Sequence, residues 1–261
     1  MRKKVAIELF GEMRFWDYSN FAPLVELCNE NDLDVEMLGT FWNDEYTRKQ
    51  DLSCFKKLQL INPITPKKRH TLEPYFYSLR SSNKQRLEHQ RATNTEYLFI
   101  MAGRTDVTFN INNASSERFK QLIESCNNNN FPWVSHLSNR KPDVHAISTV
   151  DEGTWFEDKF FIMNEYGLNT LSGYYDSTLS RQADSNDAYV IFRYHRSVGL
   201  AIIANNVKIL EYPIPFTPNL IRHTIINELN LTREQEESIR HKIKEFQDYS
   251  KLKQFLVDRF K

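Results

Sequence analysis

Apolar runs and helical patterns alternate along the first 126 residues, and this alternation restricts the fold more than any other feature. Three short apolar runs read as buried strands, over Lys4–Phe10, Asp34–Thr40 and Tyr97–Met101. Stretches with apolar residues at helical spacing separate them, over Ala22–Asn31 and Glu73–Arg91. Strands that alternate with helices typically build a parallel sheet. The sequence therefore predicts an α/β fold with a mostly parallel central sheet flanked by helices.

Weaker patterns extend this alternation along the chain. Further candidate strands are Leu58–Ile64, Val107–Phe109 and Lys208–Tyr212. A helix is expected to follow a cap at Ser115 or Ser116, because apolar residues then recur on one helical face. A second helix is expected over Asp187–Val198.

The C-terminal tail has the pattern of helices that begin near Asn219. Thr232–Gln235 has the residues of a capping box. An amphipathic stripe follows, formed by Ile239, Ile243, Phe246, Leu252, Phe255, Leu256 and Phe260. Its polar face mixes both charges, which favours packing on the core over a membrane surface. We therefore divide the chain into an α/β domain, residues 1–216, and a C-terminal helical extension packed on it, residues 217–261.

Composition excludes several classes of protein. Lys and Arg number 34, as do Asp and Glu, so nucleic-acid binding would need a local basic patch. The apolar runs are far below the roughly 18 residues of a membrane span. Glu8, Glu12 and Arg14 interrupt any signal-peptide core. Seven glycines leave no Gly-rich phosphate loop, and three widely spaced cysteines suggest reduced thiols. We expect a cytoplasmic protein without an integral membrane segment.

Arg104 and Asp106 directly follow the apolar run Tyr97–Met101 and are the most informative polar pair. Ligands of open parallel sheets bind beyond the carboxyl ends of the strands. In extended backbone, residues i and i+2 point the same way, so both side chains would face one ligand. Asp suits Mg²⁺ or Mn²⁺, and Arg suits phosphate oxygens. The other interpretation, which spacing alone favours, is a salt bridge that closes the strand end.

Asp158 belongs to an acidic cluster that is interleaved with Trp155 and Phe156 and whose other members are Asp151, Glu152 and Glu157. It immediately precedes an apolar run, so it should lie where a strand begins. A carboxylate beside aromatic rings fits a sugar-binding edge with a general base. A solvated acidic loop is the equally economical interpretation.

In their order and spacing, five segments resemble nucleotide-sugar-dependent glycosyltransferases of the GT-A fold, found in capsule and lipopolysaccharide clusters and in large viruses and phages. The segments are Phe10–Phe15, Asp34–Trp42, Tyr77–Lys84, Glu96–Asp106 and Asp158–Phe161. The resemblance covers roughly residues 4–200. It departs from the family at Arg104, which stands where a strict DxD motif has its first Asp, and at Glu12, where Gln is commoner.

The resemblance implies that residues 1–216 are a nucleotide-sugar-binding catalytic domain. Gly11 and Arg14 would approach the donor nucleotide, and Ser78 and Asn83 would line its pocket.

The resemblance also implies that Asp106 would hold a divalent cation, Mn or Mg, on the donor diphosphate. Arg104 in the motif puts that metal dependence in doubt, and its guanidinium would replace part of the metal charge. Asp158 would be the general base if the reaction inverts configuration.

The function that the resemblance implies is glycosyl transfer from a nucleotide-diphosphate sugar to an acceptor hydroxyl. The acceptor is a glycan or, in a phage, a hydroxymethylated DNA base. The basic stretches Lys67–His70 and Arg80–Arg91 favour the DNA acceptor. One alternative is a non-catalytic nucleotide-sugar-binding module of the same fold, because Arg104 departs from the motif. A nucleotidyltransferase is a third, although it would want two or three clustered carboxylates.

Overall fold

A seven-stranded sheet forms the centre of the molecule in the computed structural model, which describes residues 2–64, 73–127, 133–135, 160–174, 208–209 and 217–260. Its strands are β1 (Lys3–Gly11), β2 (Leu33–Trp42), β3 (Lys57–Ile61), β4 (Tyr97–Gly103), β6 (Trp133–Ser135), β7 (Phe160–Met163) and β8 (Lys208–Ile209). They lie in the order β3-β2-β1-β4-β7-β6-β8. β3, β2, β1 and β4 are parallel, and β7 runs antiparallel to β4 and β6. The α/β fold with a mostly parallel sheet is confirmed.

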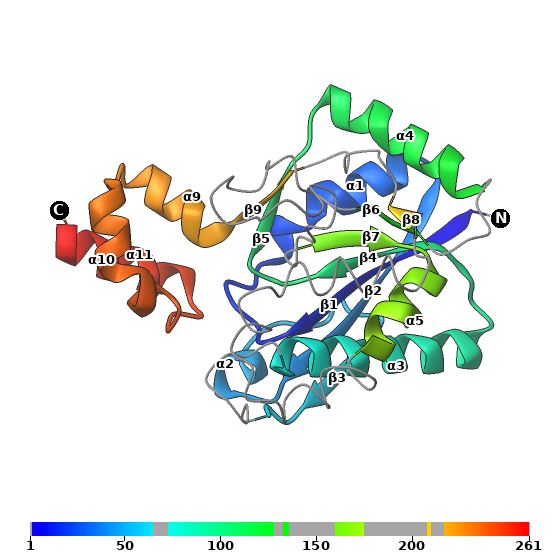
Figure 1. Cartoon of the computed structure of the whole chain (residues 1–261), viewed down its shortest axis with the longest axis horizontal. Coiled ribbons are helices and arrows are strands. Elements are labelled where there is room, and N and C mark those ends of the chain that lie inside the picture. Colours follow the sequence, from blue (N-terminus) through cyan, green and yellow to red (C-terminus); the bar gives the residue numbers. More distant parts are fainter. Residues whose placement is uncertain are drawn as a thin grey trace, which may run out of the picture.

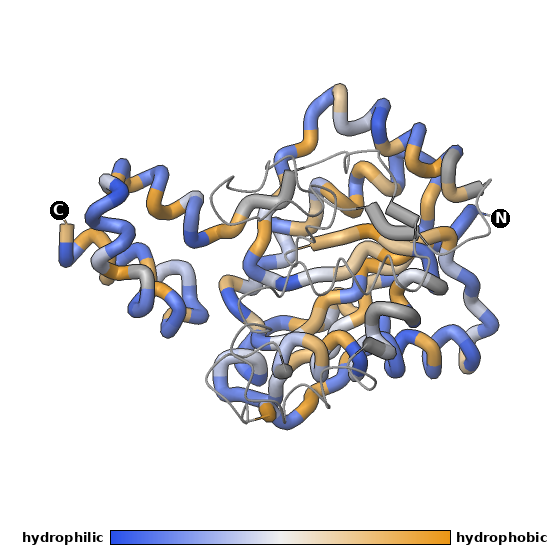
Figure 2. The backbone as a smooth tube through the Cα atoms, in the orientation of Figure 1, coloured by the Kyte–Doolittle hydropathy of each residue, from blue (hydrophilic) through white to orange (hydrophobic). Residues whose placement is uncertain are grey.

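Helices cover both faces of this sheet. They are α1 (Ala22–Glu30), α2 (Glu45–Arg48), α3 (Glu73–Thr93), α4 (Asn113–Asn127) and α5 (Glu165–Tyr174). α1 and α4 lie on one face and α3 and α5 on the other (Figure 1). The sequence of β1 is mostly apolar because both faces of the strand are buried. Ile7 and Leu9 pack toward α1, and Phe10 packs toward α3. In Figure 2 the central strands are mostly orange, while α4 alternates blue and orange.

The parallel strands end at one common edge, called here the carboxyl edge. Gly11 at the end of β1 lies in register with Phe41 of β2, and Leu9 with Gly103 of β4. The residues that follow these three strands are therefore neighbours in space, as expected for a parallel sheet.

Two expected element starts are wrong, and local chemistry explains both. α4 begins at Asn113, and its cap is Asn112, whose Oδ1 accepts from the Ser115 backbone N–H at 3.1 Å. Asn caps as well as Ser, and the Asn112 backbone N–H donates to the Ser115 Oγ at 3.1 Å. The C-terminal helices begin at Ile221, not Asn219, because Thr217–Leu220 forms strand β9. β9 pairs antiparallel with β5 (Val107–Asn110).

Three helices end the chain: α9 (Ile221–Glu228), α10 (Arg233–Ile243) and α11 (Tyr249–Phe260). The capping box of Thr232 and Gln235 at the start of α10 is confirmed. Their apolar faces pack on one another and bury Phe15 from the β1–α1 loop; the expected stripe contributes Ile239, Ile243, Leu252 and Leu256 to this cluster. Figure 1 shows the three helices beside the carboxyl edge of β1. In the part of the chain that the structure describes, no helix has the length and apolarity of a bilayer span. The helix expected over Asp187–Val198 lies outside the described residues.

Two buried carboxylates on the sheet hold α3 in place. Glu8 in the middle of β1 lies 3.2 Å from the guanidinium of Arg86, and both side chains are fully buried. Glu36 on β2 accepts from Tyr97 at 2.6 Å, from Lys4 at 2.6 Å and contacts His89 at 3.1 Å. α3 is thereby fixed on the sheet at two points along its length.

The Glu36 cluster makes stability depend on acid pH. Burial alone would raise the pKa of Glu36, but hydrogen bonds from Lys4, Tyr97 and His89 lower it to about 2, from an ordinary value of 4.5. The folded state therefore holds fewer protons on this group, so its contribution is complete above pH 4.5 and disappears as the pH falls toward 2. We expect Glu36→Gln to cost up to about 3 kcal/mol at pH 7 and to flatten this acid limb in urea unfolding.

Asp34→Asn is the matched control, since Asp34 is an exposed carboxylate two residues earlier on the same strand. It should leave the acid limb unchanged. Equal stability of the wild type and Glu36→Gln at pH 7 would contradict the assignment.

Candidate functional site

The predicted pair Arg104 and Asp106 follows β4 at the carboxyl edge and forms a two-pronged ion pair. Arg104 Nε donates to one Asp106 oxygen at 2.8 Å, and the terminal nitrogen donates to the other at 2.7 Å. The Asp106 side chain is 3% exposed, whereas that of Arg104 is 27% exposed and reaches solvent. This is the salt bridge that spacing alone favours. Asp106 thus fixes the orientation of a guanidinium that borders solvent.

Thr105 lies between these two residues and joins the β4–β5 turn to the β1–α1 loop. Its hydroxyl accepts from the Arg14 backbone N–H and donates to the Arg14 carbonyl, both at 2.9 Å. Thr105 is 1% exposed. The sequence analysis did not predict a role for Thr105. In extended backbone, however, its side chain points away from those of Arg104 and Asp106, and this alternation could have indicated that Thr105 is buried. These two hydrogen bonds connect the β1–α1 loop, which contains Arg14, directly to the β4–β5 turn, which contains Arg104.

Arg14 and Glu12 form an ion pair within the β1–α1 loop. Their side chains are 20% and 27% exposed. Arg14 therefore has the same arrangement as Arg104: a partly exposed guanidinium held by a carboxylate two residues away. The carboxyl edge presents two oriented cations.

Gly11 at the end of β1 lies close to Ser78 on α3. Gly11 has φ +96°, a conformation that favours glycine, and a Cβ on it would lie 4.0 Å from the Ser78 side chain. Ser78 on α3 is fully buried; its hydroxyl donates to the Pro74 carbonyl at 2.7 Å and accepts from the Trp42 indole at 3.1 Å. Ser78 thus holds the Trp42 ring, at the end of β2, beside the end of β1.

Asn83 lies apart from this group, about 7.5 Å further along α3 by helix rise. Its amide nitrogen donates to Asn169 at 3.0 Å and to Ser172 at 2.7 Å, both on α5, and its oxygen accepts from Arg86. Asn83 joins α3 to α5 in the described structure. The structure does not bring it together with Gly11 and Ser78.

A cation site would need more ligands than the described residues supply. Both Asp106 oxygens accept from Arg104. Within the described ranges, no group of three or more His, Cys, Asp or Glu side chains converges as a metal ion would require. These residues do not fit a divalent cation held by the chain itself. Asp158, the predicted base, lies outside the described residues.

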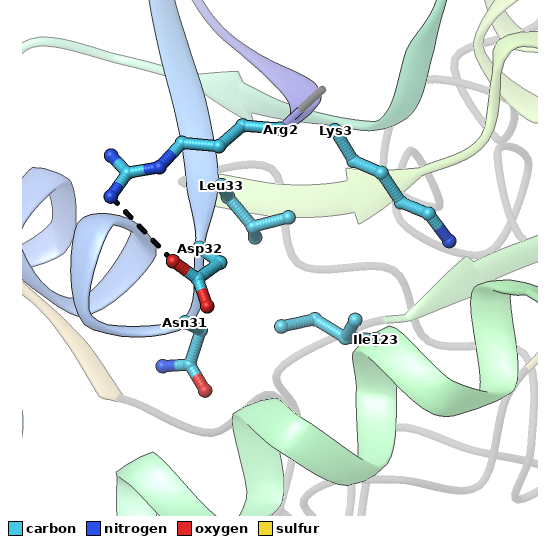
Figure 3. Close-up of a pocket in the computed structure, with 6 residues that line it drawn as sticks. All are labelled: Arg2, Lys3, Asn31, Asp32, Leu33 and Ile123. Atoms are coloured by element: carbon cyan, nitrogen blue, oxygen red, sulfur yellow. Dashed lines mark ion pairs between the residues drawn. The ribbon is translucent and has the colours of Figure 1, made fainter.

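A cavity of about 420 Å³ lies at the opposite edge of the sheet (Figure 3). It is lined by Arg2, Lys3, Asn31, Asp32, Leu33 and Ile123. Arg2 reaches across it to Asp32 at 3.5 Å. A second cavity, of about 590 Å³, follows the outer edge of β2 beside Lys4 and Glu36. Neither contains a predicted site residue.

Comparisons with known proteins give no family. No protein-family model and no curated protein matches the chain. Among solved structures, a crystal structure of 4-diphosphocytidyl-2C-methyl-D-erythritol synthase is similar with a TM-score of 0.46 and 14% identity. The match covers 89% of this chain and 99% of that one. At this score and identity the likeness carries no argument about the function of the chain. The class that the strand order and helix layers define is an α/β protein with a mostly parallel central sheet.

Proposed function

We propose that the protein is a glycosyltransferase that binds the diphosphate of a nucleotide-sugar donor at the carboxyl edge of the sheet. The observation that carries the proposal is the pair of oriented, partly exposed guanidiniums of Arg14 and Arg104 on loops joined through Thr105. Arginine suits diphosphate because its planar fork matches two phosphate oxygens. The sequence resemblance supplies the sugar, which the geometry by itself does not specify.

The chemistry asks for positive charge at this edge. When a glycosidic bond to a nucleoside diphosphate breaks, negative charge develops on the leaving diphosphate. Donors already aimed at that position lower the barrier, because no reorganisation is needed during the reaction. Arg104, held in place by Asp106, would stabilise the leaving group, and Arg14, held by Glu12, would position the other phosphate. Gly11, with φ +96°, allows the backbone to turn where β1 ends and the β1–α1 loop begins.

The domain assignment belongs to the same proposal. Residues 1–216 would form the donor-binding catalytic domain, and residues 217–261 its helical extension. The acceptor would be a glycan or a hydroxymethylated DNA base. A salt-sensitive shift of modified duplex DNA on a native gel would favour the DNA acceptor, and no shift at low salt would leave the glycan.

Calorimetry with a panel of nucleoside diphosphates, with and without Mn²⁺, tests the binding site. We expect binding that is at least partly retained without the metal, because the described cations are protein side chains. A companion screen for hydrolysis of nucleotide sugars tests the enzyme activity. No nucleoside diphosphate binding under either condition would overturn the proposal.

A non-catalytic binding module of the same fold is the second candidate. One observation favours it: Asp106 is already occupied by Arg104 on both oxygens. Nucleotide binding without donor hydrolysis or transfer would support it.

Asp158→Ala tests the base predicted from the sequence. If Asp158 deprotonates the acceptor, transfer falls about 100-fold or more while the nucleoside diphosphate Kd is unchanged, because the residue acts on the acceptor side. Glycosyl transfer and calorimetry on the same preparation measure the two effects. Asp151→Ala, a neighbour in the same acidic cluster, is the matched control. Transfer at the wild-type rate would leave Asp158 without a catalytic role.

A further inference from the structure

The loop between α10 and α11 contacts the β1–α1 loop, although the two are more than two hundred residues apart in the chain. The side-chain amide of Gln247 donates to Glu12 and to Asp44, each at 3.2 Å. The Gln247 carbonyl accepts from the Phe15 backbone N–H at 2.6 Å. One residue of the α10–α11 loop therefore contacts the segments that follow both β1 and β2.

Phe15 gives this contact a conformational role. It has φ +49°, in the left-handed region that non-glycine residues seldom adopt. It is 5% exposed, with its ring in the apolar cluster of α9, α10 and α11. A strained backbone of this kind persists only where its surroundings enforce it. Here the Gln247 carbonyl and the helical cluster supply that enforcement.

The amide of Gln247 also has an electrostatic role. Glu12 and Asp44 both approach a single neutral nitrogen. Glu12 pairs through its other oxygen with Arg14. Gln247 therefore fixes the carboxylate that in turn orients the Arg14 guanidinium. The C-terminal helices also contact the segment that follows β4. The backbone N–H of Ile221, at the start of α9, donates to the Asp106 carbonyl at 3.1 Å.

We propose that Gln247 is a positioning residue of the donor site. Together with the packing of the Phe15 ring among the C-terminal helices, it holds the β1–α1 loop so that Arg14 faces the donor diphosphate. This rests on the proposed function. It assigns the C-terminal helices a part in donor binding, which neither the sequence resemblance nor the comparisons give them.

Gln247→Ala tests the proposal against Gln254→Ala. Gln254 is a matched, exposed glutamine on α11 whose amide donates to Asp258 of the same helix at 2.6 Å. The readouts are the Kd of the nucleoside diphosphate that the wild type binds, the KM and kcat of donor hydrolysis, and hydrogen exchange of amides 12–16. For Gln247→Ala we expect a Kd and KM about tenfold higher, with kcat changed less, and faster exchange in the loop. Gln254→Ala should match the wild type in all three.

Gln247→Glu adds a test that does not depend on the alanine variant folding. The new carboxylate would face Glu12 and Asp44, so binding should fall further than in Gln247→Ala. Adding Asp44→Asn lets an amide at position 44 donate to the new carboxylate and leaves the Glu12–Arg14 ion pair in place. We expect this double variant to bind more tightly than Gln247→Glu alone.

The outcomes separate this proposal from the function on which it rests. If the wild type binds nucleoside diphosphate and Gln247→Ala equals Gln254→Ala in Kd and loop exchange, the positioning role is overturned and the proposed function stands. The role is also overturned if Asp44→Asn restores nothing to Gln247→Glu. If the wild type binds no nucleoside diphosphate, the proposed function fails, and this role in donor binding fails with it.

Discussion

Arg104→Ala is expected to lower the turnover of nucleotide-sugar hydrolysis about 100-fold or more. The size follows from the loss of one strong contact to charge that develops in the transition state. The variant also leaves Asp106, whose side chain is 3% exposed, without the guanidinium that satisfies both its oxygens. An unpaired carboxylate at the donor site would repel the diphosphate. Both effects act in the same direction, so Arg104→Ala should be the most damaging single change at the carboxyl edge.

A second variant separates orientation by Asp106 from a metal-binding role. If Asp106 acts by orienting Arg104, Asp106→Asn should lower turnover. The double variant, Arg104→Ala with Asp106→Asn, should then have a turnover no lower than that of Arg104→Ala alone. If Asp106 instead holds a cation, Asp106→Asn should abolish a Mn²⁺ dependence that Arg104→Ala retains. Arg233→Ala is the matched control, since this arginine is 90% exposed on α10 and pairs with Glu237 one turn along the same helix. Wild-type turnover in Arg104→Ala would exclude the leaving-group role.

The sequence predicted well those features that depend on neighbours along the chain. Alternating apolar patterns gave β1, β2, β4, α1 and α3 to within a few residues, because burial on both faces leaves a local signature. The i, i+2 spacing correctly placed Arg104 and Asp106 side by side. The start of α4 was wrong because Asn112 and Ser115 are both good caps, and the sequence alone does not rank them.

The contacts that define the site join distant parts of the chain, and no local pattern reports them. Thr105 meets Arg14 across 91 positions, and Gln247 meets Glu12 across 235. Glu8 reads in the sequence as an interruption of an apolar run, and only its burial against Arg86 shows its role. Such pairs become visible once the parallel order of the sheet and the place of the C-terminal helices are known.

Arg86→Met is expected to destabilise the fold by about 3–5 kcal/mol at pH 7, the cost of leaving one member of a buried ion pair without its partner. The side chains of Arg86 and Glu8 are both fully excluded from solvent, and Arg86 also donates to Gln90 on α3. Methionine fills much of the volume but supplies no charge. Urea unfolding followed by circular dichroism measures the loss. Arg91→Met, an exposed arginine on the same helix, is the control and should change stability by less than about 0.5 kcal/mol.

The pH dependence of Arg86→Met distinguishes loss of the charge pair from simple loss of packing. Burial raises the pKa of Glu8, and the Arg86 charge opposes that rise. Without Arg86 the pKa of Glu8 rises further, so the folded variant takes up a proton that the unfolded chain releases. A group with a raised folded pKa loses stability as the pH increases, so the deficit against the wild type should shrink as the pH is lowered toward 5. Adding Glu8→Gln should remove that pH dependence and recover part of the stability, because it removes the uncompensated charge. A deficit that stays constant with pH, and that Glu8→Gln deepens, would mean that α3 is anchored by packing alone.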